Sequence, residues 1–308
     1  MKKYFLSMDD ITKSEIFEIF EITKQLKKNP YGNQLNHKIF ALFFKHSLPW
    51  LKLSFEAGIK QLNGSVIHFN PSVYDQLLKE KSLDDMIKNL KKHVDATIMG
   101  AFSHRTLQNI SKYSDVSIIN AVSDLENPCQ VLSDLFTIKE RFKDFETLKL
   151  VYVGDGNNVC NSLLLGCAKV GMDVAVACPN GYEPDKNIVE LARNYTRVSK
   201  SRVTIGTEPK EIVKDANIIY NDTFISMGDE KEKQKRLSIF IPKYQVNDRL
   251  LKSAASDVLY MHPLPAQRGE EVTPEVIDSL RSIVFDQAEN RMHAQKALLM
   301  KMMGIGTL

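Results

Sequence analysis

The sequence feature that most constrains the fold is a regular alternation between short apolar runs and longer segments with helical periodicity. Runs typical of buried strands lie at 39–44, 65–69, 96–99, 116–120, 149–153, 173–177, 203–205, 216–220, 258–260 and 283–285. Segments with apolar residues at helical spacing lie at 10–27, 51–62, 83–93, 105–111, 129–141, 158–170, 186–198, 209–215 and 290–303. Strands that alternate with helices favour a parallel sheet with helices on its faces. The sequence therefore predicts an α/β fold.

The polar stretch at 141–147 interrupts this alternation, which restarts after it. A chain of 308 residues also suits two domains better than one. We expect two domains over residues 1–142 and 143–286, each with a parallel sheet flanked by helices, and a last helical segment over 287–308. Ligands of such folds bind at the carboxyl ends of the strands, so the loops that follow these ends are the expected site.

The charge balance and the cysteines narrow the class of protein. The 41 basic and 38 acidic residues leave a net charge of +3, which gives no support for a nucleic-acid partner. The four cysteines have neither CxxC spacing nor a disulfide pattern, which indicates reduced thiols. No apolar run approaches the ~20 residues of a membrane span, and no apolar segment of a secretory signal follows the first ten residues. We expect a cytoplasmic protein with no membrane partner.

The turn after the strand at 39–44 presents a conflict between geometry and chemistry. A strand that turns into a helix directs backbone N–H groups and the positive end of the helix dipole outward, which is a common way to hold a phosphate. The side chains at this turn are Leu48, Pro49, Trp50 and Leu51. None of them carries a positive charge or a hydroxyl group for a phosphate, and Pro49 has no N–H.

Five further stretches lie on or near the loops after predicted strands. They are Glu126-Asn-Pro-Cys-Gln130, Gly154-Asp-Gly-Asn-Asn158, Asn221-Asp-Thr-Phe-Ile-Ser-Met-Gly228, His262-Pro-Leu-Pro-Ala-Gln-Arg-Gly-Glu-Glu-Val272 and Gln287-Ala-Glu-Asn-Arg-Met292. In this order, and over nearly the whole chain, they resemble the aspartate/ornithine carbamoyltransferase family. The Asp-x-x-x-Ser-Met-Gly pattern within 222–228 is similar to the ornithine branch in particular.

The resemblance implies a fold and a reaction. It implies a carbamoyl-phosphate domain, an amino-acid domain, a C-terminal helix that returns to the first domain, and homotrimers with shared active sites. The implied reaction converts carbamoyl phosphate and ornithine into citrulline and phosphate, with no metal and no organic cofactor. In such a reaction the protein positions the amine and stabilises the charge on the carbonyl oxygen and the leaving phosphate.

The resemblance assigns the acceptor side to two of these stretches. Asp222 matches the carboxylate that holds the α-ammonium of ornithine, and Asn157 and Asn158 match the asparagines that hold its α-carboxylate. Ser226 and Met227 match the loop that closes over ornithine. Taken without the resemblance, Asn158 is a helix N-cap and Asp222 a solvated turn residue. The matching loop favours the binding roles.

On the donor side the chain departs from the family pattern. The family's Ser-Thr-Arg-Thr-Arg falls, without a gap, on Leu48, Pro49, Trp50, Leu51 and Lys52. The other diverged donor positions are Gly100 in place of an arginine, Asn127 in place of a histidine, Pro263 in place of a cysteine, and the adjacent Leu264. Gln76 roughly matches the loop that a neighbouring subunit contributes. Trp50 either packs in a core or an interface, or forms a wall of the former phosphate pocket.

Three candidate catalytic residues are His262, Gln130 and Arg291, the last two being kept from the family pattern. A hydrogen bond to a charged group contributes roughly 1.5–3 kcal/mol, so the lost donors remove on the order of 5 kcal/mol of phosphate binding. We therefore expect poor use of carbamoyl phosphate. Two hypotheses follow: a carbamoyltransferase-like enzyme acting on ornithine or a close analogue with an altered donor, or a non-catalytic ornithine-binding paralogue that serves as a sensor or partner subunit.

Overall fold

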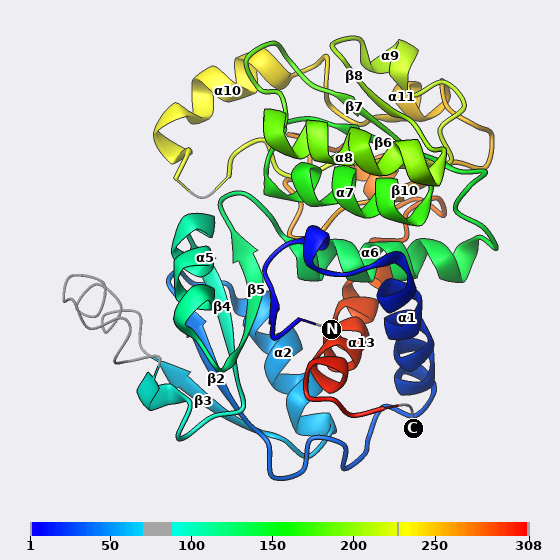
Figure 1. The fold of residues 1–308 in the computed structure, drawn as a ribbon. Coiled ribbons are helices and arrows are strands. Elements are labelled where there is room, and N and C mark those ends of the chain that lie inside the picture. Colours follow the sequence, from blue (N-terminus) through cyan, green and yellow to red (C-terminus); the bar gives the residue numbers. More distant parts are fainter. Residues whose placement is uncertain (1, 70–87, 227, 307–308) are drawn as a thin grey trace. The chain divides into compact units, whose positions relative to one another are not determined.

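The computed structural model describes residues 2–69, 88–226 and 228–306, and the chain divides into two units (Figure 1). The first unit comprises Met1–Phe136 and Glu289–Leu308, and the second comprises Thr137–Ala288. The last helix, α13 (Val284–Met302), begins in the second unit and continues in the first. Each unit has its own five-stranded sheet.

The sheet of the first unit has the strand order β1-β5-β4-β2-β3, and all paired strands run parallel. Its strands are β1 (Tyr4–Phe5), β2 (Ile39–Phe44), β3 (Ser65–Phe69), β4 (Ala96–Phe102) and β5 (Ser117–Ser123). The helices that follow or precede them are η1 (Met8–Asp10), α1 (Lys13–Lys28), α2 (Pro49–Gln61), α5 (His104–Tyr113) and α6 (Pro128–Arg141).

The apolar pattern explains why this sheet is covered on both faces. β2 reads IFALFF and is buried over nearly its whole length, as expected for an interior strand between two helical layers. On one face, Phe43 and Met99 pack with Leu107 and Ile110 of α5. Helix α1 begins at a capping box in which Thr12 and Glu15 bond each other's backbone N–H groups.

The sheet of the second unit has the order β10-β9-β6-β7-β8 and is also parallel. Its strands are β6 (Lys149–Val153), β7 (Asp173–Ala177), β8 (Val203–Gly206), β9 (Ile218–Tyr220) and β10 (Leu259–Met261). Its helices are α7 (Asn158–Val170), α8 (Lys186–Ser199), α9 (Pro209–Ile212), η2 (Glu230–Glu232), α10 (Lys233–Phe240), α11 (Asp248–Leu251) and α12 (Pro274–Ile277). Val151, Ile219 and Tyr260 pack in one core with Phe224 and Phe240.

Each sheet has a switch point, where strands on one side follow the chain in one direction and strands on the other side follow it in the opposite direction. In the first sheet the point lies between β2 and β4, where Phe44 pairs with Gly100. In the second sheet it lies between β6 and β9, because β7 and β8 follow on one side and β10 on the other. Ligands of open α/β sheets bind outside the carboxyl ends of the strands at such a switch point.

The predicted fold class is confirmed, and two local predictions need correction. The strand predicted at 283–285 is wrong, because Ser282 forms only an isolated bridge with Tyr260 and Val284 already begins α13. An apolar run this short fits either a strand or the first turn of a helix. Consequently α13 begins earlier than the predicted helix at 290–303. Of the helix predicted at 83–93, residues 83–87 lie outside the described part of the chain, 88–90 are helical, and 91–93 form a turn.

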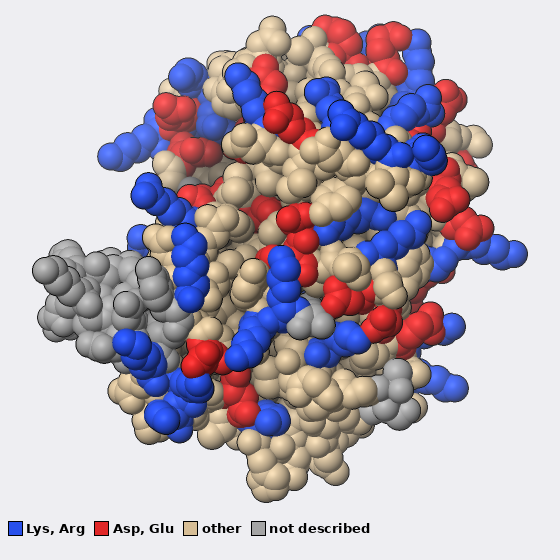
Figure 2. Space-filling view, in the orientation of Figure 1, with Lys and Arg blue, Asp and Glu red and all other residues tan. Residues whose placement is uncertain are grey.

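Surface charge is mixed, as the net charge of +3 suggests. On the face shown in Figure 2, Lys and Arg side chains lie interspersed with Asp and Glu side chains. The described part of the chain contains no helix that is both long enough and apolar enough to cross a membrane.

Candidate active site

Asn157 and Asp222 meet at the switch point of the second sheet. β6 ends at Val153, and the turn that follows it leads to Asn157. β9 ends at Tyr220, and Asp222 lies two residues further on. Asn157 Nδ2 donates a hydrogen bond to Asp222 Oδ2 at 2.8 Å. The two adjacent strand ends therefore bring together two residues that the sequence had assigned to one ligand.

The turn between β6 and Asn157 depends on glycine. Gly154 has φ 140°, which disfavours any side chain. A Cβ atom on Gly156 would lie 2.2 Å from the backbone nitrogen of Pro184. The close approach is fixed by a hydrogen bond from the Gly156 N–H to the Tyr182 carbonyl at 2.9 Å. Asn157 is thus held against a rigid part of its own unit.

The Asp222 carboxylate is half-buried and held in one orientation. Its Oδ2 accepts from Asn157, and its Oδ1 accepts from the Thr223 N–H at 2.8 Å. Burial raises the pKa of Asp222 above its ordinary value of 3.8, while nearby His262 and the two hydrogen bonds act in the opposite direction. A partly desolvated carboxylate that is already fixed in place is a strong partner for an ammonium group.

The helix-capping role considered for Asn158 belongs to Asn157. Asn157 Oδ1 accepts from the N–H groups of Val159 and Cys160 at 3.0 and 3.1 Å, and Asn158 is the first residue of α7. Capping uses the residue just before the first helical turn, so the alternative was placed one residue too late. Because the Asn157 side-chain oxygen accepts from the N–H groups of α7, its amide nitrogen is the group that faces Asp222.

The remaining predicted acceptor residues lie on the loop after β9. Ser226 is half-buried, and its carbonyl accepts from the Asp229 N–H at 3.0 Å. Met227 lies outside the described residues. Their roles in closing over a ligand stay predictions.

His262 follows β10 and is fully buried. Its Nδ1 accepts from the Leu264 N–H at 3.0 Å, so a neutral ring carries its proton on Nε2, which lies 3.3 Å from Glu271 Oε1. The backbone N–H of His262 donates to Gln287 Oε1 at 2.9 Å. These contacts fix the half-buried Pro263 and Leu264 that follow. The histidine shapes this loop, and its assignment as a catalytic residue stays a prediction.

In the first unit the structure brings Gln130 and Arg291 together. Gln130 lies on α6 and is buried, with its Nε2 donating to Asp134 Oδ1 at 2.8 Å. Arg291 lies on α13, and its Nη1 donates to Gln130 Oε1 at 3.2 Å. Asn127 is half-buried directly before α6, where its carbonyl accepts from the Val131 N–H at 3.2 Å. The two residues kept from the family pattern are therefore partners, although 161 positions separate them.

No side chain caps the start of α2, which follows the turn after β2. Leu48 occupies the N-cap position without a side-chain hydrogen bond, and Pro49 is the first helical residue. Trp50 is 60% exposed, Leu51 is buried, and Lys52 is half-buried. The exposure of Trp50 excludes packing in the core of its own unit, which leaves an interface or a wall of the former phosphate pocket. Gln76, the predicted contribution from a neighbouring subunit, lies outside the described residues.

Gly100 lies on β4 opposite the end of β2, and an aromatic ring fills the space beside it. A Cβ atom on Gly100 would lie 2.5 Å from Cδ1 and 2.7 Å from Cε1 of Phe44. Phe44 is only 6% exposed. An arginine at position 100 would therefore require this ring to move.

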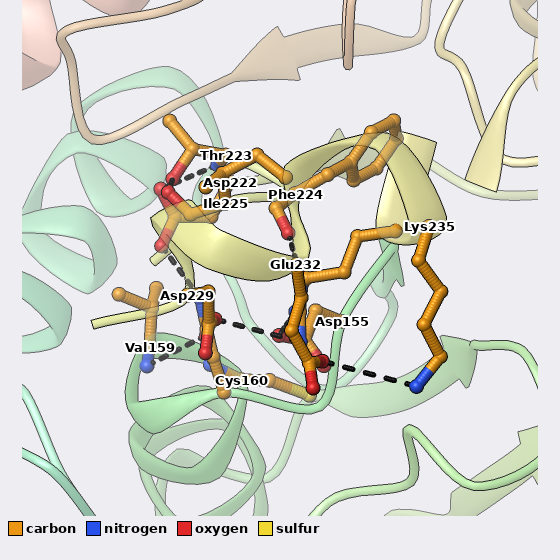
Figure 3. A network of polar contacts seen from close by, with 12 residues as sticks. Asp155, Val159, Cys160, Asp222, Thr223, Phe224, Ile225, Asp229, Glu232 and Lys235 are labelled. Carbon is orange, nitrogen blue, oxygen red and sulfur yellow. Dashed lines mark hydrogen bonds and ion pairs between the residues drawn. The ribbon is translucent and has the colours of Figure 1, made fainter. Parts of the chain in front are cut away.

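A further set of contacts around the acceptor loop was missed by sequence reasoning. Asp155, Phe224 and Asp229 lie close to one another beside Asp222 in Figure 3. Arg236, on α10, joins them. It falls in a charged stretch outside the quoted motifs, and only its place one helical turn before the buried Phe240 could have drawn attention to it. Among the residues that the structure describes, no three His, Cys, Asp or Glu side chains are grouped to hold a metal ion.

Comparison with known proteins gives a consistent result over the whole chain. The model of the carbamoyl-P binding domain of aspartate/ornithine carbamoyltransferase matches residues 3–140, and that of the Asp/Orn binding domain matches residues 146–302. The chain belongs to the aspartate/ornithine carbamoyltransferase family.

Individual family members are similar over nearly their full length. The ornithine carbamoyltransferase of Methanosarcina acetivorans is 44% identical over 307 residues, which cover 98% of this chain and 100% of that protein. The Bacillus subtilis enzyme is 42% identical over 297 residues, covering 96% of this chain and 92% of that protein. The solved structure of ornithine carbamoyltransferase from Pyrococcus furiosus aligns with a TM-score of 0.92 and 40% identity, covering 97% of this chain and 96% of that one.

The family assignment that the motifs indicated is confirmed. The expected divergence in donor use finds no support in these comparisons, because the similar proteins carry the ordinary name of the enzyme. Altered donor use is therefore a proposal that rests on the residues of this chain alone.

Proposed function

We propose that the second unit binds an amino acid of the ornithine type and that the chain acts as a transferase on its side-chain amine. The observation that carries this proposal is the Asp222 carboxylate, fixed by Asn157 at the switch point of the sheet. Its raised pKa indicates that the carboxylate lacks sufficient compensation within the protein. An α-ammonium group would supply the missing positive charge. The name and identity of the related enzymes support ornithine as the amino acid.

Isothermal titration calorimetry tests the acceptor. L-Ornithine is titrated into the protein, with norvaline as a ligand that lacks the side-chain amine and putrescine as one that lacks the α-carboxylate. Asp222→Asn should weaken ornithine binding about 30-fold, because losing one partner of a desolvated charge pair costs ~2 kcal/mol or more. Asp173→Asn is the matched control, since Asp173 pairs with Arg202 at the start of β7. No binding by the wild type at millimolar ornithine, or equal binding by Asp222→Asn, contradicts the proposal.

We further propose that carbamoyl phosphate is a poor donor for this chain. A phosphate dianion needs charge-assisted hydrogen bonds to replace its water. The start of α2 supplies Leu48, Pro49 and Trp50, and the position beside β2 holds Gly100 under the ring of Phe44. This chemistry favours a donor without a phosphate dianion, or a non-catalytic ornithine-binding paralogue as the second candidate.

Steady-state citrulline formation decides between ordinary and altered donor use. We expect turnover orders of magnitude below that of an ordinary family member, and saturation at micromolar carbamoyl phosphate with ordinary turnover would refute this. The repaired variant carries Leu48→Ser, Pro49→Thr, Trp50→Arg, Leu51→Thr, Lys52→Arg and Gly100→Arg. It should gain donor affinity if the rest of the site is preserved. Ornithine binding without turnover of any donor supports the paralogue.

We also propose that the chain assembles as a homotrimer, as its family resemblance implies. Gln76 would then reach the site of a neighbouring subunit. Light scattering at micromolar protein concentration tests the assembly, and a monomeric mass contradicts it.

A further inference from the structure

The side chain of Arg236 is only 8% exposed, although it lies in one of the most charged stretches of the chain. Its three nitrogens reach three residues on two segments of the second unit, the loop after β9 and the turn after β6. Nε donates to the Phe224 carbonyl at 2.7 Å, Nη2 bonds Asp155, and Nη1 lies 3.4 Å from Asp229 Oδ2. Burying an arginine is costly unless its donors have partners, and these three contacts supply them.

Aromatic rings fix the plane of the guanidinium. Its central carbon lies 5.0 Å from the centre of the Tyr182 ring and 5.7 Å from that of Phe240. Phe240 in turn stacks on Phe224, with ring centres 4.6 Å apart. The planar fork therefore packs against both rings, which also contact each other, and a lysine could not reproduce its three directions.

Each contact of Arg236 lies within three residues of a proposed acceptor residue. Asp155 precedes Asn157 by two positions, and its carbonyl accepts from the Asn157 N–H at 2.7 Å. Phe224 follows Asp222 by two positions. Asp229 closes a turn onto the carbonyl of Ser226 at 3.0 Å. A shift of the guanidinium would thus move both partners of the Asn157–Asp222 hydrogen bond and the Ser226 turn.

From this geometry we propose that Arg236 is a positioning residue for the acceptor site, which fastens the 222–229 loop to the turn after β6. The proposal deepens the proposed function and rests on it for the identity of the ligand. Arg236 itself contacts none of the reacting groups. It acts by holding Asp222, Asn157 and Ser226 at the spacing that the amino acid requires. The contacts around this loop are visible in Figure 3.

Arg236→Lys tests the proposal because it keeps the charge and removes the fork. We expect the dissociation constant for ornithine to rise about tenfold or more, since one charge-assisted hydrogen bond is worth about that factor. The backbone amides of Thr223 and Asp229 should exchange with deuterium about tenfold faster in the unliganded protein, because both lie in the loop that loses its anchor.

The matched control is Lys149→Met. Lys149 also donates to two backbone carbonyls of the second unit, those of Ile212 and Lys214 at 2.8 and 2.7 Å, but it lies at the opposite end of β6 from Asn157. Thermal melting is measured for both variants. Lys149→Met should leave ornithine affinity and loop exchange within about twofold of the wild type even where it lowers the melting temperature equally.

Unchanged affinity and unchanged loop exchange in Arg236→Lys overturn the proposal, as does an equal change of both in Lys149→Met. If Arg236→Lys does not fold, Asp229→Ala removes the 3.4 Å contact while keeping the other two contacts of Arg236, and should still speed the exchange of the loop. If the wild type binds no ornithine, the proposed acceptor fails, while the exchange measurement still decides whether Arg236 fastens the loop.

Discussion

Replacing Gly100 with alanine adds one methyl group at the point where β2 and β4 meet, and the structure predicts its cost. The new Cβ atom would lie 2.5 and 2.7 Å from two carbons of the Phe44 ring. Real Cβ atoms do not approach other heavy atoms below 3.0 Å, so the ring or the strand must shift. Since these atoms belong to a rigid ring that is 6% exposed, the shift involves the whole side chain.

The expected magnitude combines two opposing effects. Overpacking a filled core costs about 1–3 kcal/mol. Removing a glycine from the unfolded chain returns about 0.4–1 kcal/mol. Gly100→Ala should therefore lose about 1–2 kcal/mol, which corresponds to a melting temperature lower by roughly 1.5–3 °C for a chain of 308 residues.

Differential scanning calorimetry measures this loss, and a double-mutant cycle assigns it. In a Phe44→Leu background the cost of Gly100→Ala should fall by about 1 kcal/mol, because the clashing ring is gone. Gly206→Ala is the control, since its Cβ would meet only the tip of Ile212 at 2.9 Å. A wild-type or raised melting temperature for Gly100→Ala would show that Phe44 has another low-energy position.

Three further predictions concern buried ionisable groups. Burial, opposed chiefly by Arg236, raises the pKa of Asp155 from 3.8 to about 6, so the folded state binds the extra proton between these values. The unfolding free energy of wild type minus that of Asp155→Asn should therefore fall by up to ~3 kcal/mol as pH rises from 4 to 6, and should stay constant above pH 6. A difference in urea midpoints that does not change with pH would contradict this. His262→Leu removes a polar neighbour of the buried Glu271 carboxylate, which keeps the Gln267 N–H, and should cost about 1–3 kcal/mol. A large part of this loss should be regained when Glu271→Leu is added, and additive losses of the two substitutions on thermal melting would deny the pairing. Burial lowers the pKa of Lys296 from 10.5 to about 8. Between pH 8 and 10.5 the folded protein has therefore lost a proton that the unfolded chain still binds, and stability should rise with pH over this range. Lys296→Met should lack that rise in denaturant titrations.

The alternation of strands and helices was sufficient to predict the fold class. Asn157 and Asp222 could be placed together because parallel strands end at a common edge and these strands are neighbours. Two-residue β1 was missed, since so short a segment shows no periodicity. The burial of His262 and the contacts of Arg236 also escaped prediction. The His262 N–H binds Gln287, 25 positions away, and Arg236 binds Asp155, 81 positions away, and such proximity follows only from packing.

The course of α13 has a consequence for the order in which the protein can fold during synthesis. Its later part belongs to the first unit, where Lys296 Nζ donates to the Pro30 carbonyl and to Gln61 Oε1, both at 2.8 Å. The ribosome makes these residues only after the whole of Thr137–Ala288. At about 5–20 residues per second, this delay lasts roughly ten to thirty seconds. The first unit to be translated is thus the last to be completed, and its unfinished core must be protected while the second unit is made.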